Sequence, residues 1–362
     1  MSTHSNSTTH MRPIIDPHIH LWDQLGTPRR TSIVARLAGW NPRLLSTLVR
    51  WTFPRDLVDF FGADAGLDIV RDYLPADHRA DASGHHLAAT VHVQAGWQAA
   101  GPLGPVGETR WLEQLEGGPE GIVAYADLAL GREVEQVLRA HREASSKVRG
   151  VRYMLAHHPS REVHSFAARP SIAHEPQFLE GFAHLADQGL SFDAWCYHHQ
   201  LGDIAALARR FPDTSIILCH LGTPVAVGGP FGPGGHSDSD RRNTFQAWSD
   251  ALAEVAAEPN VTAKISGLTM PVLGWGYHQG DAPSVDRLVD ELGPLVHRAV
   301  ELFGVDRCMF ASNYPVDRIS QPFGTLYAAY AQLIAPYPDG AQHKLMFSNA
   351  ARIYRLSVGL AS

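Results

Sequence analysis

The chain has 362 residues, of which 44% are hydrophobic and 19% are charged, and its formal net charge is −7. These values exclude a mainly disordered chain, and the mildly acidic balance argues against nucleic acid as a partner, because phosphate binding needs an excess of lysine and arginine. No run approaches the roughly 18 consecutive apolar residues that a membrane span needs, so no membrane partner is expected.

The chain begins with a polar segment and contains no closely spaced cysteine pair. Residues 1–12 lack the basic and apolar regions of a signal peptide and predict a disordered polar tail. The three cysteines, Cys196, Cys219 and Cys308, lie far apart and form no CxxC motif. Buried thiols of this kind are typical of a reduced, cytoplasmic protein.

Eight short apolar runs alternate with longer helical stretches along the rest of the chain. The runs span residues 14–16, 88–93, 122–126, 150–154, 190–195, 215–219, 261–265 and 307–311. The helical stretches include residues 133–144, 177–188, 201–211, 244–258 and 284–303. Continuous apolar strands bounded by helices indicate a parallel sheet covered on both faces, and eight such units predict a single (β/α)8 TIM barrel over residues 13–358. An open doubly wound sheet is the alternative, which is disfavoured because no glycine-rich phosphate loop follows any run.

Two segments depart from this alternation. Residues 24–75 form an unusually long connection, and its stretch 29–55 carries six arginines and no acidic residue, with leucine, valine and aromatic residues interleaved. We expect this insertion to be partly helical and to pack over the barrel mouth or against another subunit of a homo-oligomer, because so many aromatic residues are hard to leave exposed. The alternative is a helical surface insertion with a solvated basic face. Residues 225–240 are rich in glycine, proline, serine and aspartate, and predict a mobile loop at the same end of the barrel.

Histidines, 21 in all, gather where the predicted strands end. His18 and His20 follow the first run, and residues i and i+2 of an extended chain point to the same side. Two convergent imidazoles can hold one divalent metal, such as zinc, or can polarise a carbonyl and orient water without a metal. His220 ends the sixth run, where a neutral imidazole could take up a proton or bind metal. His198, after the fifth run, could supply a third nitrogen ligand alongside His18 and His20.

Two cations lie inside apolar predicted strands. A buried guanidinium or ammonium needs an anion, so Arg152 and Lys264 are expected to hold the carboxylate or the developing oxyanion of an anionic small-molecule substrate. A structural partner, such as Asp16 for Arg152, is the alternative. Aromatic residues near the strand ends are expected to line the substrate site; they are Tyr197 and Tyr314, together with Trp195, Trp275 and Tyr277.

The segments that carry these residues resemble the strand motifs of the amidohydrolase superfamily, in its amidohydrolase-related (type 2) branch. The opening motif is Asp16-Pro-His-Ile-His-Leu-Trp-Asp23, and the resemblance covers about residues 14–356. The other similar segments, in the same order as in the family, are residues 150–153, 191–195, 217–224, 261–268, 307–317 and 347–356. The resemblance implies a TIM barrel with a mononuclear or metal-free site at its C-terminal face. It also implies lactonase-like hydrolysis, as in sugar-lactone and pyrone-dicarboxylate lactonases, whereas related branches decarboxylate aromatic and dienoic acids.

Asn313 departs from the family pattern. At the end of the eighth strand those lactonases carry an aspartate that is expected to activate water, and an amide cannot act as a general base near neutral pH. Asn313 can still orient water or donate a hydrogen bond to an oxyanion. Three interpretations stay open: activation by a metal-bound hydroxide or a histidine, a decarboxylase or lyase reaction, or a ligand-binding barrel without turnover. Asp317 is a candidate for a displaced base, although a side chain at this position would more often face solvent.

The sequence therefore predicts a hydrolase that opens a lactone or similar cyclic ester of a small carboxylic acid. His18, His20, His220 and Asn313 are the expected catalytic residues, and they should meet in one pocket at the C-terminal ends of the strands.

Overall fold

The computed structural model describes residues 12–62 and 70–358. The predicted polar tail over residues 1–12 lies, apart from Arg12, outside the described residues.

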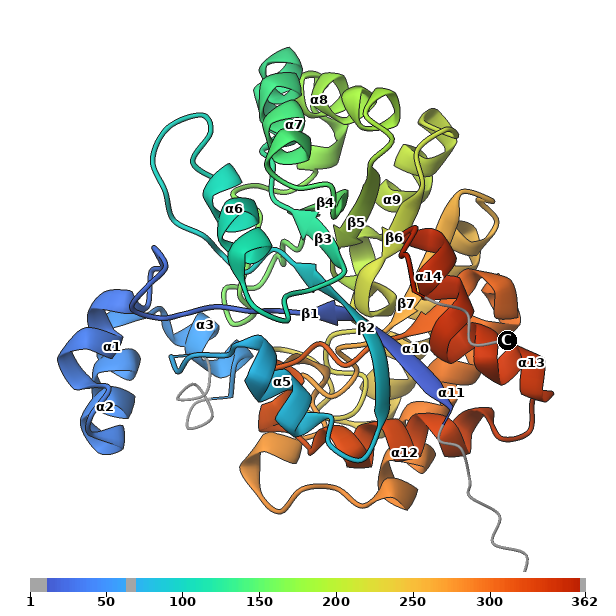
Figure 1. The fold of residues 1–362 in the computed structure, drawn as a ribbon. Helices are drawn as coiled ribbons and strands as arrows, with labels where there is room; N and C mark the ends of the chain where they lie inside the picture. The colour runs from blue at the N-terminus through green and yellow to red at the C-terminus, as the bar shows by residue number, and fades with distance from the viewer. Residues whose placement is uncertain (1–11, 63–69, 359–362) are drawn as a thin grey trace, which may run out of the picture.

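Eight parallel strands follow one another around a barrel in chain order (Figure 1). They are β1 (Pro13–Ile19), β2 (His86–Val93), β3 (Gly121–Ala124), β4 (Val148–Met154), β5 (Ser191–Trp195), β6 (Ile216–Leu218), β7 (Val261–Ile265) and β8 (Cys308–Phe310). The last strand returns to the first just beyond their regular pairing, where Ile19 and Tyr314 form a parallel bridge. The predicted TIM barrel is confirmed.

The helices surround this barrel (Figure 1). They are α1 (Ser32–Ala38), α2 (Pro42–Thr52), α3 (Arg55–Phe60), α5 (Pro75–Asp81), α6 (Val106–Gln114), α7 (Val134–Ala144), α8 (Pro176–Asp187), α9 (Leu201–Arg210), α10 (Asp238–Ala256), α11 (Val285–Phe303), α12 (Phe323–Ile334), α13 (Asp339–His343) and α14 (Asn349–Ile353). Helix α10 begins before the predicted start at residue 244, because Ser237 and Asp240 form a capping box. Among the helices that the structure describes, none is long and apolar enough to cross a membrane.

The strands bury side chains on both faces, as their continuous apolar sequences require. One set packs outward against the helices, as Phe192 of β5 does against Phe178 and Phe182 of α8. The other set fills the inside of the barrel and includes Val91, Ile217 and Met309. Because the core is closed in this way, the polar side chains at the C-terminal ends of the strands are held by a rigid frame.

In the part of the insertion that the structure describes, three short helices lie between β1 and α5. Helices α1 and α2 project from the barrel wall (Figure 1) and share a small core of their own, which includes Val34, Leu45 and Val49. Trp40 and Trp51 are 75% and 86% exposed, so these two side chains do not pack over the barrel mouth within this chain. Contact with another subunit stays a prediction.

Candidate active site

The ends of β1 and β8 are fastened together, and this places the first two histidines beside Asn313. The backbone N–H of Asn313 donates to the carbonyl of His18 at 2.9 Å, and the N–H of His20 donates to the carbonyl of Tyr314 at 2.8 Å. Below them, the carboxylate of Asp16 accepts hydrogen bonds from the backbone N–H of Ser312 at 2.9 Å and from its hydroxyl at 2.5 Å. The HxH motif therefore has a fixed position relative to the eighth strand.

Three imidazoles meet at this end of the barrel. The ring of His18 lies 5.0 Å from the ring of His20 and 4.6 Å from that of His220, measured between centroids. Burial lowers the pKa of all three well below 6.5, and the positive charge of Arg152 lowers each of them further, joined by that of Lys264 at His18 and His220. All three imidazoles are therefore neutral near pH 7.

The hydrogen bonds of these rings distinguish their roles. His20 Nδ1 lies 2.7 Å from the carbonyl oxygen of Val93, which can only accept, so Nδ1 carries the proton and Nε2 keeps a free lone pair. His220 Nδ1 lies 2.9 Å from the hydroxyl of Ser266, and neither ring nitrogen of His18 has a partner among the described residues. The cluster therefore contains one defined hydrogen-bond acceptor, Nε2 of His20. The neutral rings of His18 and His220 each also carry one N–H group that can donate a hydrogen bond.

Asn313 is held from behind by a buried carboxylate. Its amide Nδ2 donates to Asp317 Oδ1 at 2.9 Å, and the hydroxyl of Thr269 donates to the other oxygen at 2.8 Å. Burial raises the pKa of Asp317 to about 7, although these hydrogen bonds oppose the shift. Since Nδ2 is engaged by Asp317, the amide oxygen is the group that Asn313 has left for the cavity. Asp317 is buried behind Asn313 and does not face solvent.

Two of the four predicted catalytic residues have strained backbones. His220 and Asn313 have φ values of 57° and 60°, in the left-handed region that residues with a Cβ atom seldom adopt. Such conformations cost of order 1–3 kcal/mol each and concentrate at functional sites. Gly267, with a φ of 63°, leaves room for the His220 ring, because a Cβ atom there would lie 2.5 Å from Nδ1.

Arg152 reaches the same cavity from β4, and no carboxylate among residues 12–62 and 70–358 forms an ion pair with it. Its guanidinium is buried and donates to the backbone carbonyl of Gln94 at 2.6 Å, while Nε has no hydrogen-bond partner among the described residues. Asp16, the alternative partner from the sequence, is instead bound by Ser312 and lies 3.3 Å from His78 Nε2. A buried guanidinium without a counter-ion is a strong electrostatic attraction for an anion.

Lys264 is placed differently from the sequence prediction. Its ammonium is completely buried inside the barrel and forms an ion pair with Asp193 at 2.7 Å, and the same carboxylate oxygen accepts from the hydroxyl of Tyr354, also at 2.7 Å. Lys264 does not line the cavity, so the anion that it binds is the carboxylate of Asp193 and not a substrate carboxylate. It acts on the site only through its charge, which helps to keep His18 neutral.

Three other predicted site residues also lie outside the cavity wall. The hydroxyls of Tyr197 and Tyr314 donate to the backbone carbonyls of His164 and Gln321. His198 Nδ1 accepts from the backbone N–H of Val225 at 3.3 Å and is not grouped with His18 and His20. These residues fall in short turns after their strands, where the alternation of an extended chain no longer fixes the side-chain direction.

A cavity of about 550 Å³ is lined by His20, His220, Asn313 and Arg152. His18 was predicted to share this pocket, but it is fully buried beside the other two imidazoles and is not part of the cavity wall. Part of the cavity wall is apolar and comes from the insertion and from the loop after β4; these residues are Trp22, Phe53, Leu57, Phe60, Phe61 and Phe166. Trp195 of β5 lines it as predicted, whereas Trp275 and Tyr277 do not. The sequence left open whether the insertion covers the mouth or contacts another subunit, and it could not show that α3 contributes Leu57 and Phe60 to the cavity wall. Gln94, directly after β2, was missed, although its place at a strand end is the same signal that marked the histidines.

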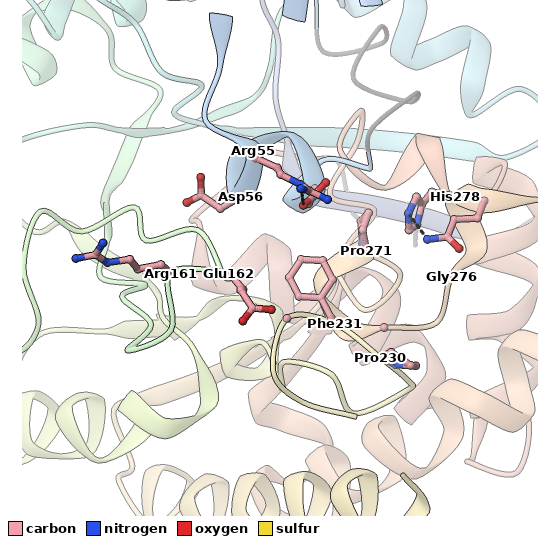
Figure 2. A pocket seen from close by; sticks show the side chains of 13 residues that line it. Arg55, Asp56, Arg161, Glu162, Pro230, Phe231, Pro271, Gly276 and His278 are labelled. Carbon is pink, nitrogen blue, oxygen red and sulfur yellow. Dashed lines mark hydrogen bonds and ion pairs between the residues drawn. The ribbon is translucent and has the colours of Figure 1, made fainter. Parts of the chain in front are cut away.

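The opposite face of α3 borders a second, outer cavity of about 890 Å³ (Figure 2). Arg55 and Asp56 line it together with Glu162 and with Phe231, which belongs to the predicted loop 225–240. None of the predicted catalytic residues lines this cavity. We therefore assign the chemistry to the smaller cavity.

The donor atoms do not form a complete metal site. Across residues 12–62 and 70–358, no three His, Cys, Asp or Glu side chains are placed to hold one metal ion. Asn313 stands where an anionic ligand is expected, and the predicted third ligand His198 bonds elsewhere. The residues present do not fit a metal held by three protein ligands, so the chemistry below is derived from the imidazoles.

Comparison with known proteins gives consistent similarities over nearly the whole chain. A family model described as amidohydrolase matches residues 15–356. The chain is 31% identical over 346 residues to the uncharacterized protein y4mH of Sinorhizobium fredii, which covers 95% of this chain and 98% of that protein. It is 26% identical over 313 residues to L-fucono-1,5-lactonase of Burkholderia multivorans, with 84% and 93% covered. A crystal structure of an amidohydrolase from Burkholderia multivorans with bound zinc shares the fold, at a TM-score of 0.68, 22% identity and coverage of 95% and 99%.

Proposed function

The chain belongs to the amidohydrolase family of enzymes, and we propose that this enzyme opens a lactone or similar cyclic ester of a small, anionic carboxylic acid. The observation that carries the proposal is the grouping of neutral imidazoles, a buried amide and an unpaired guanidinium in one cavity. Lactonases among the relatives support the same reaction class.

In the proposed mechanism His20 is the general base. Its Nε2 lone pair accepts a proton from the attacking water, while the amide oxygen of Asn313 orients that water. The water oxygen forms a bond to the carbonyl carbon, and the ring N–H of His220 donates to the oxyanion. The ester C–O bond then breaks, and the proton on His20 passes to the ring oxygen that leaves. The product is the open hydroxy acid, whose substrate-derived carboxylate is held by Arg152.

The family also contains other reaction classes, so the assay must separate them. We expect the purified enzyme to open γ- and δ-lactones, detected as acid release with a pH indicator, and to act more slowly on matched linear esters. Release of carbon dioxide from aromatic carboxylic acids without lactone opening would instead identify a decarboxylase or lyase. Ligand binding with neither reaction would identify a non-catalytic barrel.

Gly267 gives a local test of the position of His220. Gly267→Ala puts a methyl group against His220 Nδ1, and we expect kcat for lactone opening to fall about 100-fold, the scale for one misplaced polar group. Gly189→Ala is the matched control, because Gly189 has the same φ of 63° but open space around its Cβ position. Equal loss of kcat in both variants would assign the effect to backbone strain alone, so thermal unfolding is measured for each.

A further inference from the structure

The cavity wall combines apolar rings with arginine side chains, and this combination defines a substrate class. We infer that the substrate is a lactone with an aromatic or similarly flat apolar body and a carboxylate, and not a polyhydroxylated sugar lactone. The inference rests on the proposed function and adds the chemical class of the substrate.

The insertion turns one side of the cavity into an aromatic surface. Phe60 of α3 packs edge-to-face on Phe166 at 5.0 Å, and Phe166 lies 4.6 Å from the ring of Trp195. Leu57 and Phe53 add further apolar side chains to the cavity wall. A ligand ring placed here would bury its faces against carbon, which is favourable for an aromatic body and unfavourable for a ring covered with hydroxyl groups.

The polar groups of the wall are poorly suited to a polyol. None of the described residues that line the cavity is an aspartate or a glutamate, the side chains that accept most readily from hydroxyl groups. Thr31 and Ser165 already hydrogen-bond within the protein, and Gln94 keeps a single unpartnered amide donor, Nε2, among the described residues. A hydroxyl buried without a partner costs roughly tenfold in affinity, so a lactone with three such groups would be strongly disfavoured.

The charge of the wall favours an anion. Arg152 lies at the inner end, and Arg29 and Arg30 lie on the insertion side. The two insertion arginines sit over aromatic rings, Arg29 at 4.5 Å from the Trp22 centroid and Arg30 at 5.7 Å from that of Phe53. Guanidinium groups backed by rings can bind a carboxylate while an aromatic ligand packs beside them.

Four γ-lactones test the inference, because they vary ring type and charge independently. They are 5-carboxyphthalide, phthalide, glucaro-1,4-lactone and galactono-1,4-lactone. We expect kcat/KM to be highest for 5-carboxyphthalide, at least tenfold lower for uncharged phthalide, and at least 100-fold lower for either sugar lactone. A sugar lactone opened as fast as 5-carboxyphthalide would overturn the inference and leave the proposed function standing.

If no lactone is opened, the proposed function fails and binding decides the inference separately. The probes are then the product acids, 2-(hydroxymethyl)terephthalate and glucarate, measured by titration calorimetry. Tighter binding of the aromatic acid supports the inferred class of ligand, and equal or tighter binding of glucarate overturns it.

The Leu57→Gln variant tests whether α3 contributes to the selectivity for an aromatic lactone. Leu57 is only partly buried, so the variant should fold, and we expect kcat/KM for 5-carboxyphthalide to fall about tenfold with little change for the sugar lactones. The matched control is Arg55→Gln on the opposite face of the same helix, which borders the outer cavity in Figure 2 and should leave the selectivity unchanged. Identical selectivity in Leu57→Gln and the parent would contradict the assignment of this wall.

Discussion

Replacing His20 with glutamine is expected to lower kcat for lactone opening by about 10²–10⁴-fold, the usual contribution of a positioned general base. The imidazole is the group in the proposed mechanism with a defined basic nitrogen, because Val93 fixes its other nitrogen as a donor. KM should change much less, since substrate binding is assigned to Arg152 and the apolar wall. Steady-state kinetics of the parent and the variant measure both constants.

His141→Gln is the matched control for this experiment. His141 is also buried and its pKa is lowered by burial to about 4, but it bonds to Thr109 and Tyr125 away from the cavity. We expect this variant to lose stability and to keep its kcat per folded molecule. A similar loss of kcat in both variants would show that the effect comes from removing a buried histidine and not from removing a base.

The second large effect is expected at Asn313. Asn313→Ala should lower kcat about 10²–10³-fold, the scale for one oriented polar group. Asn313→Asp places a second carboxylate within 2.9 Å of Asp317, and the pair should hold one proton near neutral pH because two adjacent charges repel. This variant adds an anionic donor beside the histidines, so it should retain more zinc after dialysis than the parent.

Exchanging the two side chains separates charge from geometry. The double variant Asn313→Asp/Asp317→Asn keeps an amide donating to a carboxylate but puts the carboxylate on the cavity side. We expect it to unfold at a temperature close to that of the parent and to bind zinc more tightly, as measured by metal analysis. Parent-like zinc content in both Asp variants would show that the missing carboxylate is not what leaves the donor set incomplete.

The sequence predicted the barrel well because its strands are continuous apolar runs, which allow few arrangements other than a sheet covered on both faces. It also predicted which strand ends meet, since parallel strands bring their C-terminal ends to one face. His18, His20, His220 and Asn313 follow three different apolar runs, the first, sixth and eighth, and the structure brings them close together.

The depth of a residue inside the barrel could not be predicted in the same way. Arg152 and Lys264 have the same pattern, a cation in an apolar strand, yet only Arg152 reaches the cavity. Lys264 forms an ion pair with Asp193 of another strand, and the sequence does not predict this pairing. The alternation of side chains along a strand shows which way a side chain points, but it does not show which residue of another strand it will contact. The position of α3 at the cavity could not be predicted either, because it depends on how the insertion packs against the barrel, and no periodic pattern in the sequence encodes that packing.

The central claim is that buried histidines perform the hydrolysis without a carboxylate base at the eighth strand. The most direct test is the rate of 5-carboxyphthalide opening by the parent and by His20→Gln, each assayed after dialysis against a chelator and again after addition of zinc. We expect the dialysed parent to keep its turnover and His20→Gln to be slow in both conditions. Loss of turnover by the dialysed parent, with recovery on addition of zinc, would contradict the claim, as would a His20→Gln variant as active as the parent.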